Sequence, residues 1–175
     1  MREVLSQRFF DRPTLRVTRD ILGKYLVRRI GKRELAREMR DVEAYIGFKD
    51  RASHASRGRT ARNQVMFGKP GVWYVYFTYG MHWMLNIVTE RKGFPAAILI
   101  RGVGGIPGPG RVTKFFKIDR RFNGQPANRR TGLWIEDRGV KVLPRTIRRS
   151  ARIGVEYAGP WKLKLWRFHL SPQTT

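Results

Sequence analysis

Apolar residues recur along the chain at two spacings, and the first spacing is helical. Within FFDRPTLRVTRDILGK, the side chains Leu15, Thr18, Ile21 and Leu22 fall on one face of a helix. An aspartate and a proline ahead of them are residue types that open helices, and Gly23 follows the last member of the pattern. We therefore expect a helix that ends at Gly23.

Several later segments have the composition of β-strands. They are rich in β-branched and aromatic residues and are bounded by glycine, proline or charged turns. YLVRRIG and EMRDVEAYIG form the first pair, joined by the turn GKRE, and FPAAILIRG is a more buried strand. GLWIED and GPWKLKLWRFHL are typical of late strands. The five segments are residues 25–31, 38–47, 94–102, 132–137 and 159–170.

The segment VWYVYFTYGMHWMLNIV, residues 72–88, predicts a β-hairpin. Two runs of aromatic and β-branched residues flank Gly80, so the turn is expected near Tyr79 and Gly80. Because side chains alternate along a strand, Tyr74 and Tyr76 share one face of the first arm.

Polar and glycine-rich stretches separate these elements. Residues 47–71 are rich in Gly, Arg, Ser and Lys and predict a long loop, which in a compact domain is usually functional or disordered. GVGGIPGPG predicts a second loop, RVTKFFKI a short helix, and residues 119–130 a third loop. The pattern predicts an α+β fold: one compact domain over residues 1–175 with a curved, mainly antiparallel sheet.

The net charge of the chain restricts the classes of function that it can have. Lys and Arg number 37 and Asp and Glu 13, which gives a net charge of +24 over 175 residues. Such a surplus on a folded domain points to a polyanion, most often nucleic acid. From composition alone, a ribosomal or architectural binding protein is favoured over an enzyme. Binding to a membrane surface is disfavoured, because the basic residues do not line up on one amphipathic helix.

Compartment and redox chemistry follow from what the composition lacks. No apolar run approaches the length of a membrane span, and the opening residues lack the apolar segment of a secretory signal. We expect a cytoplasmic, nucleoid-associated protein. Cysteine is absent, so disulfides and thiolate metal sites are excluded.

Glu43 is out of place within the strand DVEAYIG. It lies between Val42 and Ala44 and shares a face with Tyr45. If that face meets the tyrosines of the hairpin, a carboxylate and several rings would form a pocket for a flat base. The alternative is structural: Glu43 pairs with a nearby arginine, either Arg37 or Arg40 in the sequence.

Other polar residues have a functional and a structural interpretation. Asn86 is unusual in a strand and has a structural alternative as a residue that fixes a neighbouring loop. Tyr79 is an exposed turn residue or a ring that contacts a partner. Arg59, Arg62 and Lys69 are solvated or contact phosphates. The three histidines lack zinc-ligand spacing and no Walker or Rossmann fingerprint occurs, so we expect neither a metal nor a cofactor.

Spaced motifs over nearly the whole chain resemble one known family. The run EAYIGFKDRASHASRGRTARNQVMFGKPGVWYVYFTYGMHWMLNIV resembles the core of the alkyladenine (3-methyladenine) DNA glycosylases. The resemblance begins in FFDRPTLRVTRDILGKYLVRR, continues in PAAILIRG and GPGRVTKFFKI, and closes in RIGVEYAGPWKLKLWRF. The sequence departs from the family pattern after the arginine of ILIRG and in RVTKFFKI.

The resemblance assigns roles to individual positions. Glu43 matches the general base that activates a water molecule, and Arg101 matches the arginine that helps to hold this water. Tyr79 matches the hairpin-tip residue that enters the minor groove and replaces the flipped nucleotide. The base-binding pocket would be formed by Tyr45, His54, Tyr76 and Asn86, the last of which crowds the 2-amino group of guanine.

The resemblance also implies a fold and an activity. The expected fold is a compact domain with a protruding β-hairpin. The expected activity is excision of alkylated or deaminated purines from double-stranded DNA by a monofunctional enzyme, without metal or cofactor, leaving an abasic site. We expect a monomer. A catalytically silent DNA- or RNA-binding protein of the same fold is the alternative.

Overall fold

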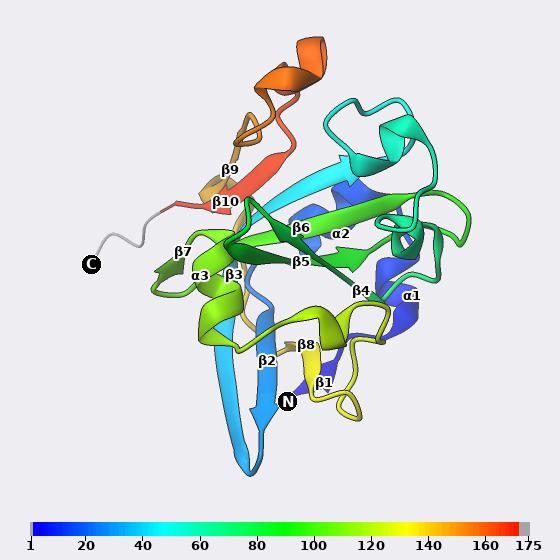
Figure 1. The fold of residues 1–175 in the computed structure, drawn as a ribbon. Helices are drawn as coiled ribbons and strands as arrows, with labels where there is room; N and C mark the ends of the chain where they lie inside the picture. Colours follow the sequence, from blue (N-terminus) through cyan, green and yellow to red (C-terminus); the bar gives the residue numbers. More distant parts are fainter. Residues whose placement is uncertain (1, 172–175) are drawn as a thin grey trace.

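Antiparallel strand pairing organises the chain. The structure, a computed structural model, describes residues 2–171. Its strands form one sheet in the order β1-β8-β2-β3-β6-β5-β4, with β10 paired to β3 and β9, and β7 paired to β6 (Figure 1). The strands are β1 (Glu3–Val4), β2 (Tyr25–Ile30), β3 (Arg33–Ile46), β4 (Trp73–Thr78), β5 (His82–Val88), β6 (Ala96–Val103), β7 (Ile106–Pro107), β8 (Leu133–Asp137), β9 (Ile147–Ser150) and β10 (Arg167–Leu170).

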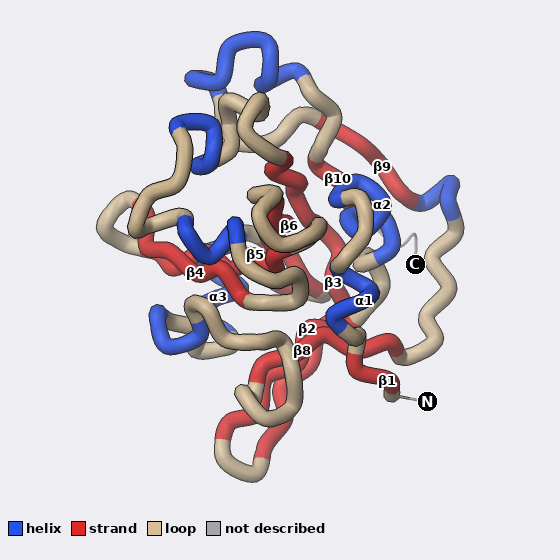
Figure 2. The backbone as a smooth tube through the Cα atoms, turned by 90° about the vertical axis from the view of Figure 1, so that its right-hand side faces the viewer, coloured by secondary structure: helices blue, strands red, loops and turns tan. Residues whose placement is uncertain are grey.

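Few helices accompany this sheet, as the colouring of Figure 2 makes plain. Helix α2 packs against β3 and β6, and α3 packs against β5 and β6. The apolar core between these layers contains Trp73, whose indole N–H donates to the carbonyl of Leu133 at 3.1 Å. The helices are α1 (Gln7–Phe10), α2 (Thr14–Asp20), α3 (Pro109–Phe115) and the 3-10 helices η1 (His54–Arg57), η2 (Gln64–Phe67), η3 (Arg120–Phe122), η4 (Pro144–Thr146) and η5 (Glu156–Leu163).

Strand β3 connects the two halves of the sheet. Its first half pairs with β2, and its second half, from Met39 to Ile46, pairs with β6. The register shifts on either side of Asp41, and such bulges bend a strand and increase its twist. The expected single compact domain with a large antiparallel sheet is therefore confirmed.

Two β-hairpins are compared by their position relative to the rest of the domain. The β2–β3 ribbon extends away from it at the bottom of Figure 1. The predicted hairpin of residues 72–88 is formed by β4 and β5, with Thr78 opposite His82. Its pairing is confirmed, whereas its protrusion from the domain stays a prediction.

The tip of the β4–β5 hairpin is a left-handed turn. Tyr79 and Gly80 have φ angles of 53° and 62°, and the N–H of Met81 donates to the carbonyl of Thr78 at 3.1 Å. A positive φ is unusual for a residue with a side chain and is often kept at functional sites. The Tyr79 ring is 78% exposed, so packing in the core does not explain its conformation.

The long loop of residues 47–71 is ordered by its own hydrogen bonds. Buried Asn63 donates to the carbonyls of His54 and Gly58 at 3.0 Å and 2.9 Å, and its side-chain oxygen accepts from the N–H of Thr60 at 2.7 Å. These bonds substitute for a sheet or helix ladder. The loop therefore has a defined path and carries two short 3-10 helices, η1 and η2.

Several predicted boundaries were wrong, for local reasons. Residues 159–163 belong to the kinked 3-10 segment η5 rather than to a strand: Gly159, with φ 57°, is non-helical and kinks the segment, and Pro160 has no N–H to donate to a sheet. The GVGGIPGPG loop instead contains β7 and the start of α3, since Pro109 at the first helical position opens that helix. The turn expected over GKRE is shorter, because β3 begins at Arg33.

The sequence patterns did not predict the shortest elements. Helix α1 has four residues and β9 has four, which is too few for a recognisable period. Among residues 2–171, no helix has the length and apolar character that crossing a membrane requires.

Candidate active site

The antiparallel register places four predicted or neighbouring side chains in one row across the sheet. Glu43 on β3 is opposite Leu99 on β6, Leu99 is opposite Asn86 on β5, and Asn86 is opposite Tyr74 on β4. Because paired residues point to the same face, the row brings a carboxylate and an amide together.

A cavity of about 290 Å³ opens over this part of the sheet. The strands supply its floor, and the loops after β3 and β9 supply the walls. Its lining residues are Tyr45, Ala52, His54, Met66, Tyr74, Tyr76, Thr78, Tyr79, Met84, Asn86, Ala97, Leu99, Arg101, Pro109, Ile153, Gly154, Val155 and Tyr157. All the predicted pocket residues thus border one space.

Glu43 is completely buried beside this cavity and is held by three groups. The Tyr45 hydroxyl donates to one carboxylate oxygen at 2.8 Å, and the N–H of Ile153 donates to the other at 2.9 Å. A guanidinium nitrogen of Arg101 lies 3.5 Å from that second oxygen. The structural alternative, in which Glu43 pairs with Arg37 or Arg40, is wrong: Glu43 pairs with Arg101, and Arg40 pairs with Glu38.

The surroundings of Glu43 act on its pKa in opposite directions. Burial raises the pKa of the carboxyl group, whereas the charge of Arg101 and the hydrogen bonds from Ile153 and Tyr45 lower it. Burial has the larger effect, so the pKa is raised above its ordinary value. A raised pKa makes the carboxylate a better proton acceptor than an exposed glutamate.

Arg101 retains an unused donor. Its Nε atom is buried and has no hydrogen-bond partner among the described residues; its separation from the Asp41 carboxylate is 3.9 Å. Because Nε is shielded from solvent, the terminal guanidinium nitrogens, one of which lies 3.5 Å from Glu43, are the donors that Arg101 can offer to a small polar molecule in the cavity.

Aromatic rings form the side of the cavity nearest to β4. The Nδ1 atom of His54 lies 2.9 Å from the Tyr74 hydroxyl, and the His54 ring meets Tyr76 edge-on with centroids 4.7 Å apart. Burial, together with the charge of Arg62, lowers the pKa of His54. The imidazole is therefore neutral at neutral pH, and the rings present an uncharged surface.

Asn86 has a role in the sheet and a position in the cavity. Its amide nitrogen donates to the carbonyl of Tyr74 at 3.1 Å. The structural alternative was a hydrogen bond that fixes a neighbouring loop. A hydrogen bond is present, but it joins two adjacent strands. Because Asn86 also lines the cavity, its amide defines the space available to a ligand.

Two exposed rings border the cavity mouth. Tyr79 reaches it from the hairpin tip, and Tyr157, which is 68% exposed, reaches it from η5. The Tyr157 hydroxyl donates to the carbonyl of Ala52 at 3.1 Å, which fixes the ring in place. Exposed aromatic rings beside a cavity are common where a large partner binds.

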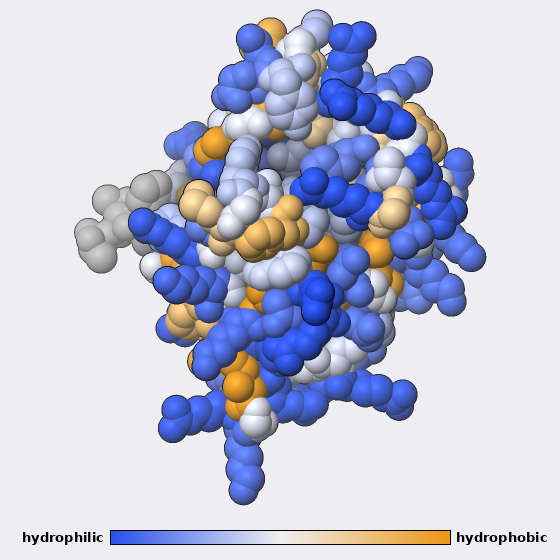
Figure 3. Space-filling view, viewed as in Figure 1, coloured by the Kyte–Doolittle hydropathy of each residue, from blue (hydrophilic) through white to orange (hydrophobic). Residues whose placement is uncertain are grey.

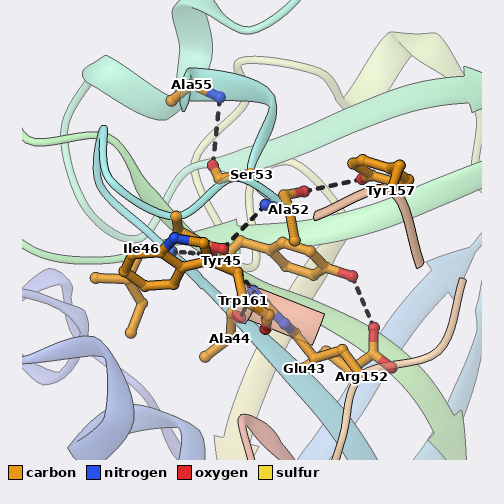
Figure 4. A network of polar contacts seen from close by, with 11 residues as sticks. Glu43, Ala44, Tyr45, Ile46, Ala52, Ser53, Ala55, Arg152, Tyr157 and Trp161 are labelled. Atoms are coloured by element: carbon orange, nitrogen blue, oxygen red, sulfur yellow. Dashed lines mark hydrogen bonds and ion pairs between the residues drawn. The ribbon is translucent and has the colours of Figure 1, made fainter. Parts of the chain in front are cut away.

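A buried ion pair joins the two loops that form the walls. Arg152 donates to both carboxylate oxygens of Asp50 at 2.6 Å and 2.8 Å, and to the carbonyl of Ala44 at 2.8 Å. Figure 4 shows Arg152 near Tyr45, whose hydroxyl points at Glu43. The guanidinium lies 4.8 Å from the centre of the Tyr45 ring.

The sequence analysis did not predict this ion pair, although it supports the walls of the site. Asp50 and Arg152 are 102 positions apart, and nothing in the spacing of either indicates the other. The available signal was compositional: a rare acid within a loop rich in arginine and glycine. The motif RIGVEY was part of the family resemblance but had no assigned role.

The chain also matches known proteins in sequence. A model of the methylpurine-DNA glycosylase family matches residues 8–107 and 105–174, which together are most of the chain. The chain belongs to the methylpurine-DNA glycosylase family. The resemblance inferred from the motifs is therefore confirmed, and with it a role as a DNA glycosylase in the repair of alkylated purines.

Curated relatives of this glycosylase cover nearly the whole chain. One from Methanocella arvoryzae is 44% identical and covers 95% of this chain and 92% of the relative. One from Legionella pneumophila (strain Corby) is 38% identical, with 95% and 93% covered. One from Myxococcus xanthus is 40% identical, with 93% and 88% covered. All three bear the name "Putative 3-methyladenine DNA glycosylase".

The predicted phosphate-contact residues of the glycosylase lie at different places. Arg62 packs over the Tyr76 ring at 5.1 Å, and Arg59 packs over Phe67 at 5.6 Å. Lys69 borders a separate cavity formed with the segment around β1 and α1. Hydrophilic side chains cover most of the face seen in Figure 3. Contact of these three residues with phosphates stays a prediction.

Within residues 2–171, no group of three or more His, Asp or Glu side chains has the arrangement of a metal site.

Burial of Glu43 has a measurable effect on stability. Its pKa is higher in the folded protein than in the unfolded chain, so its favourable contribution is full below the unfolded pKa and is lost as pH rises through the folded pKa. Glutamine does not titrate. The melting temperature of Glu43→Gln relative to wild type should therefore be higher at about pH 7 than at about pH 4.

Thermal unfolding followed by circular dichroism at both pH values measures this difference. An identical difference at the two pH values would mean that the carboxyl group binds protons equally in the folded and unfolded states.

Proposed function

We propose that this glycosylase flips alkylated or deaminated purine nucleotides out of duplex DNA and hydrolyses their N-glycosidic bonds. The observation that carries the proposal is the completely buried Glu43, paired with Arg101 beside an aromatic cavity. A merely structural carboxylate would be less costly at the surface. The net charge of +24 supports binding to the DNA backbone.

The cavity suits an extruded base. A base within the duplex hides its glycosidic carbon, so an enzyme that attacks this carbon must take the nucleotide out of the stack. Tyr45 and Tyr76 offer ring faces on which a purine can stack, an interaction that contributes about 1–3 kcal/mol per base. His54 borders the same space.

Glu43 and Arg101 supply the groups that hydrolysis needs. The bond between C1′ and the base nitrogen breaks, and its electron pair leaves with the base: a cationic alkylated purine departs as a neutral base, whereas a neutral purine departs as an anion that takes up a proton from solvent. The positive charge that develops on the sugar is stabilised by the Glu43 carboxylate. A water oxygen then bonds to C1′ while Glu43 accepts the proton of this water, and Arg101 holds the water through the terminal guanidinium N–H that lies beside Glu43.

The products are a free base and an abasic site in an intact strand. The proposed reaction needs no cofactor, and we propose that the enzyme acts as a monomer on nucleoid DNA in the cytoplasm.

The direct test is excision from a duplex that carries one hypoxanthine or one 1,N6-ethenoadenine. Release of the base, followed by strand breakage only after alkali treatment, is the expected result. Undiminished binding to the duplex without any release of either base, or of methylated purines from alkylated DNA, would instead favour a silent DNA-binding protein.

Glu43→Gln should bind damaged duplex but lose excision. The replacement is nearly the same size, so the cavity keeps its shape, while the proton acceptor is lost. A general base contributes about 100- to 10,000-fold to the rate, so single-turnover excision should fall within that range. Excision of ethenoadenine at the wild-type rate would show that Glu43 has a structural role.

Tyr79→Ala should weaken binding to damaged duplex and slow its excision. The exposed ring at the hairpin tip can fill the gap left by a flipped base and delay the return of that base. The folding stability should change by no more than about 0.5 kcal/mol, because the ring has little packing to lose. Single-stranded substrate is the control, since it has no duplex stack to replace. A large fall in melting temperature would contradict the wedge role.

Asn86→Ser should raise excision of guanine-type bases relative to hypoxanthine. The amide borders the cavity, where it would clash with a 2-amino group that hypoxanthine lacks. Loss of one such contact alters discrimination by about tenfold. The measurement is single-turnover excision of 7-methylguanine and hypoxanthine from matched duplexes. If both rates fall together at a constant ratio, the bond to the Tyr74 carbonyl is the whole role of Asn86.

A further inference from the structure

Each of the two tyrosines proposed to stack on the base has an arginine against its ring. The guanidinium of Arg152 lies 4.8 Å from the centre of the Tyr45 ring, and that of Arg62 lies 5.1 Å from the centre of the Tyr76 ring. Neither arginine lines the cavity, although both rings do. Each cation therefore contacts a ring of the cavity wall without itself bordering the cavity.

The two arginines differ in how their charge is compensated. Arg152 is buried and forms a bidentate ion pair with Asp50, so the pair is neutral as a unit. Arg62 is exposed and donates to the carbonyl of Phe77 at 2.9 Å. Among the described residues it has no carboxylate partner. Arg62 is thus the uncompensated charge of the two.

A cation in contact with an aromatic ring weakens the attraction of that ring for a second cation. The attraction between a cation and a ring depends on the electron density of the ring, which Arg62 already draws upon. A cationic base stacked on Tyr76 would lie within about 10 Å of Arg62, no farther than the Debye length at moderate salt. A neutral base has no net charge for Arg62 to repel.

The field of Arg62 extends to the cavity wall. Burial lowers the pKa of His54, and the charge of Arg62 lowers it further. His54 lines the cavity and contacts the same Tyr76 ring. A positive charge on a ligand beside Tyr76 is therefore opposed in the same way as a positive charge on His54.

We infer that Arg62 is a specificity-determining residue that shifts this glycosylase towards neutral purine lesions, such as hypoxanthine and ethenoadenine, and away from cationic N-alkylated purines. The inference rests on the proposed function. Electron-rich tyrosine rings alone would favour cationic lesions, but one of these two rings already contacts an uncompensated cation.

The test is a ratio of single-turnover excision rates, 7-methylguanine over hypoxanthine, in matched duplexes. Arg62→Gln should raise this ratio by about three- to tenfold over wild type, and the gain should shrink at high salt. Arg62→Lys keeps the charge and should stay close to the wild-type ratio. The substituted side chain is at the surface, so folding should be retained.

Arg59→Gln is the matched control. Arg59 lies on the same loop and also packs over a ring, but that ring is Phe67, which does not line the cavity. If both arginines only contact phosphates, each substitution should weaken binding of both substrates equally and leave the ratio unchanged. An unchanged or lower ratio in Arg62→Gln would overturn the inference.

A binding experiment separates this outcome from failure of the proposed chemistry. In the Glu43→Gln background, the affinities for the two duplexes are measured by fluorescence anisotropy with and without Arg62→Gln. The same rise in the affinity ratio is expected there, and no excision is needed to observe it. Wild-type protein that binds both lesions without releasing either would refute the glycosylase proposal, whereas the affinity ratio would still decide the role of Arg62.

Discussion

The antiparallel register between β3, β6, β5 and β4 is the constraint on which the site depends. It sets Glu43 and Asn86 in one row with Leu99 between them. Because side chains alternate along a strand, a slip of one residue would turn Val42 and Ala44 towards the cavity and Glu43 into the core. The core packing of Val42 and Ala44, both fully buried, therefore specifies the position of the carboxylate that lies between them.

Some features of the site lower the stability of the fold, and neighbouring groups offset this cost. A buried carboxylate is costly, and it is accommodated by the Arg101 charge and two hydrogen bonds. The positive φ of Tyr79 is accommodated by a turn with glycine as its next residue. Departures from local preference are common at functional sites in natural proteins, and two of them, buried Glu43 and Tyr79, lie at this cavity.

Much of this arrangement could be predicted from the sequence, because it depends on local patterns. Period-two alternation predicted that Glu43 and Tyr45 share a face, and the aromatic runs around Gly80 predicted the β4–β5 pairing. The walls could not be predicted in this way. Asp50 and Arg152 meet only through folding over 102 positions, and the path of η5 depends on the conformation of Gly159 rather than on any periodic pattern.

The order of the chain has a consequence for synthesis on the ribosome. Strand β10, the last strand, pairs with β3 at Val42 and Glu43, and the N–H of Ile153 completes the surroundings of the carboxylate. Ribosomes add about 5–20 residues per second, so the edge of β3 that pairs with β10 waits several seconds for its partner to emerge. A nascent chain in this interval has an unpaired strand edge and an incomplete cavity. Activity on DNA therefore requires that Ile153 and β10 have been synthesised and have joined β3, and until then this edge of β3 is open to pairing with another strand.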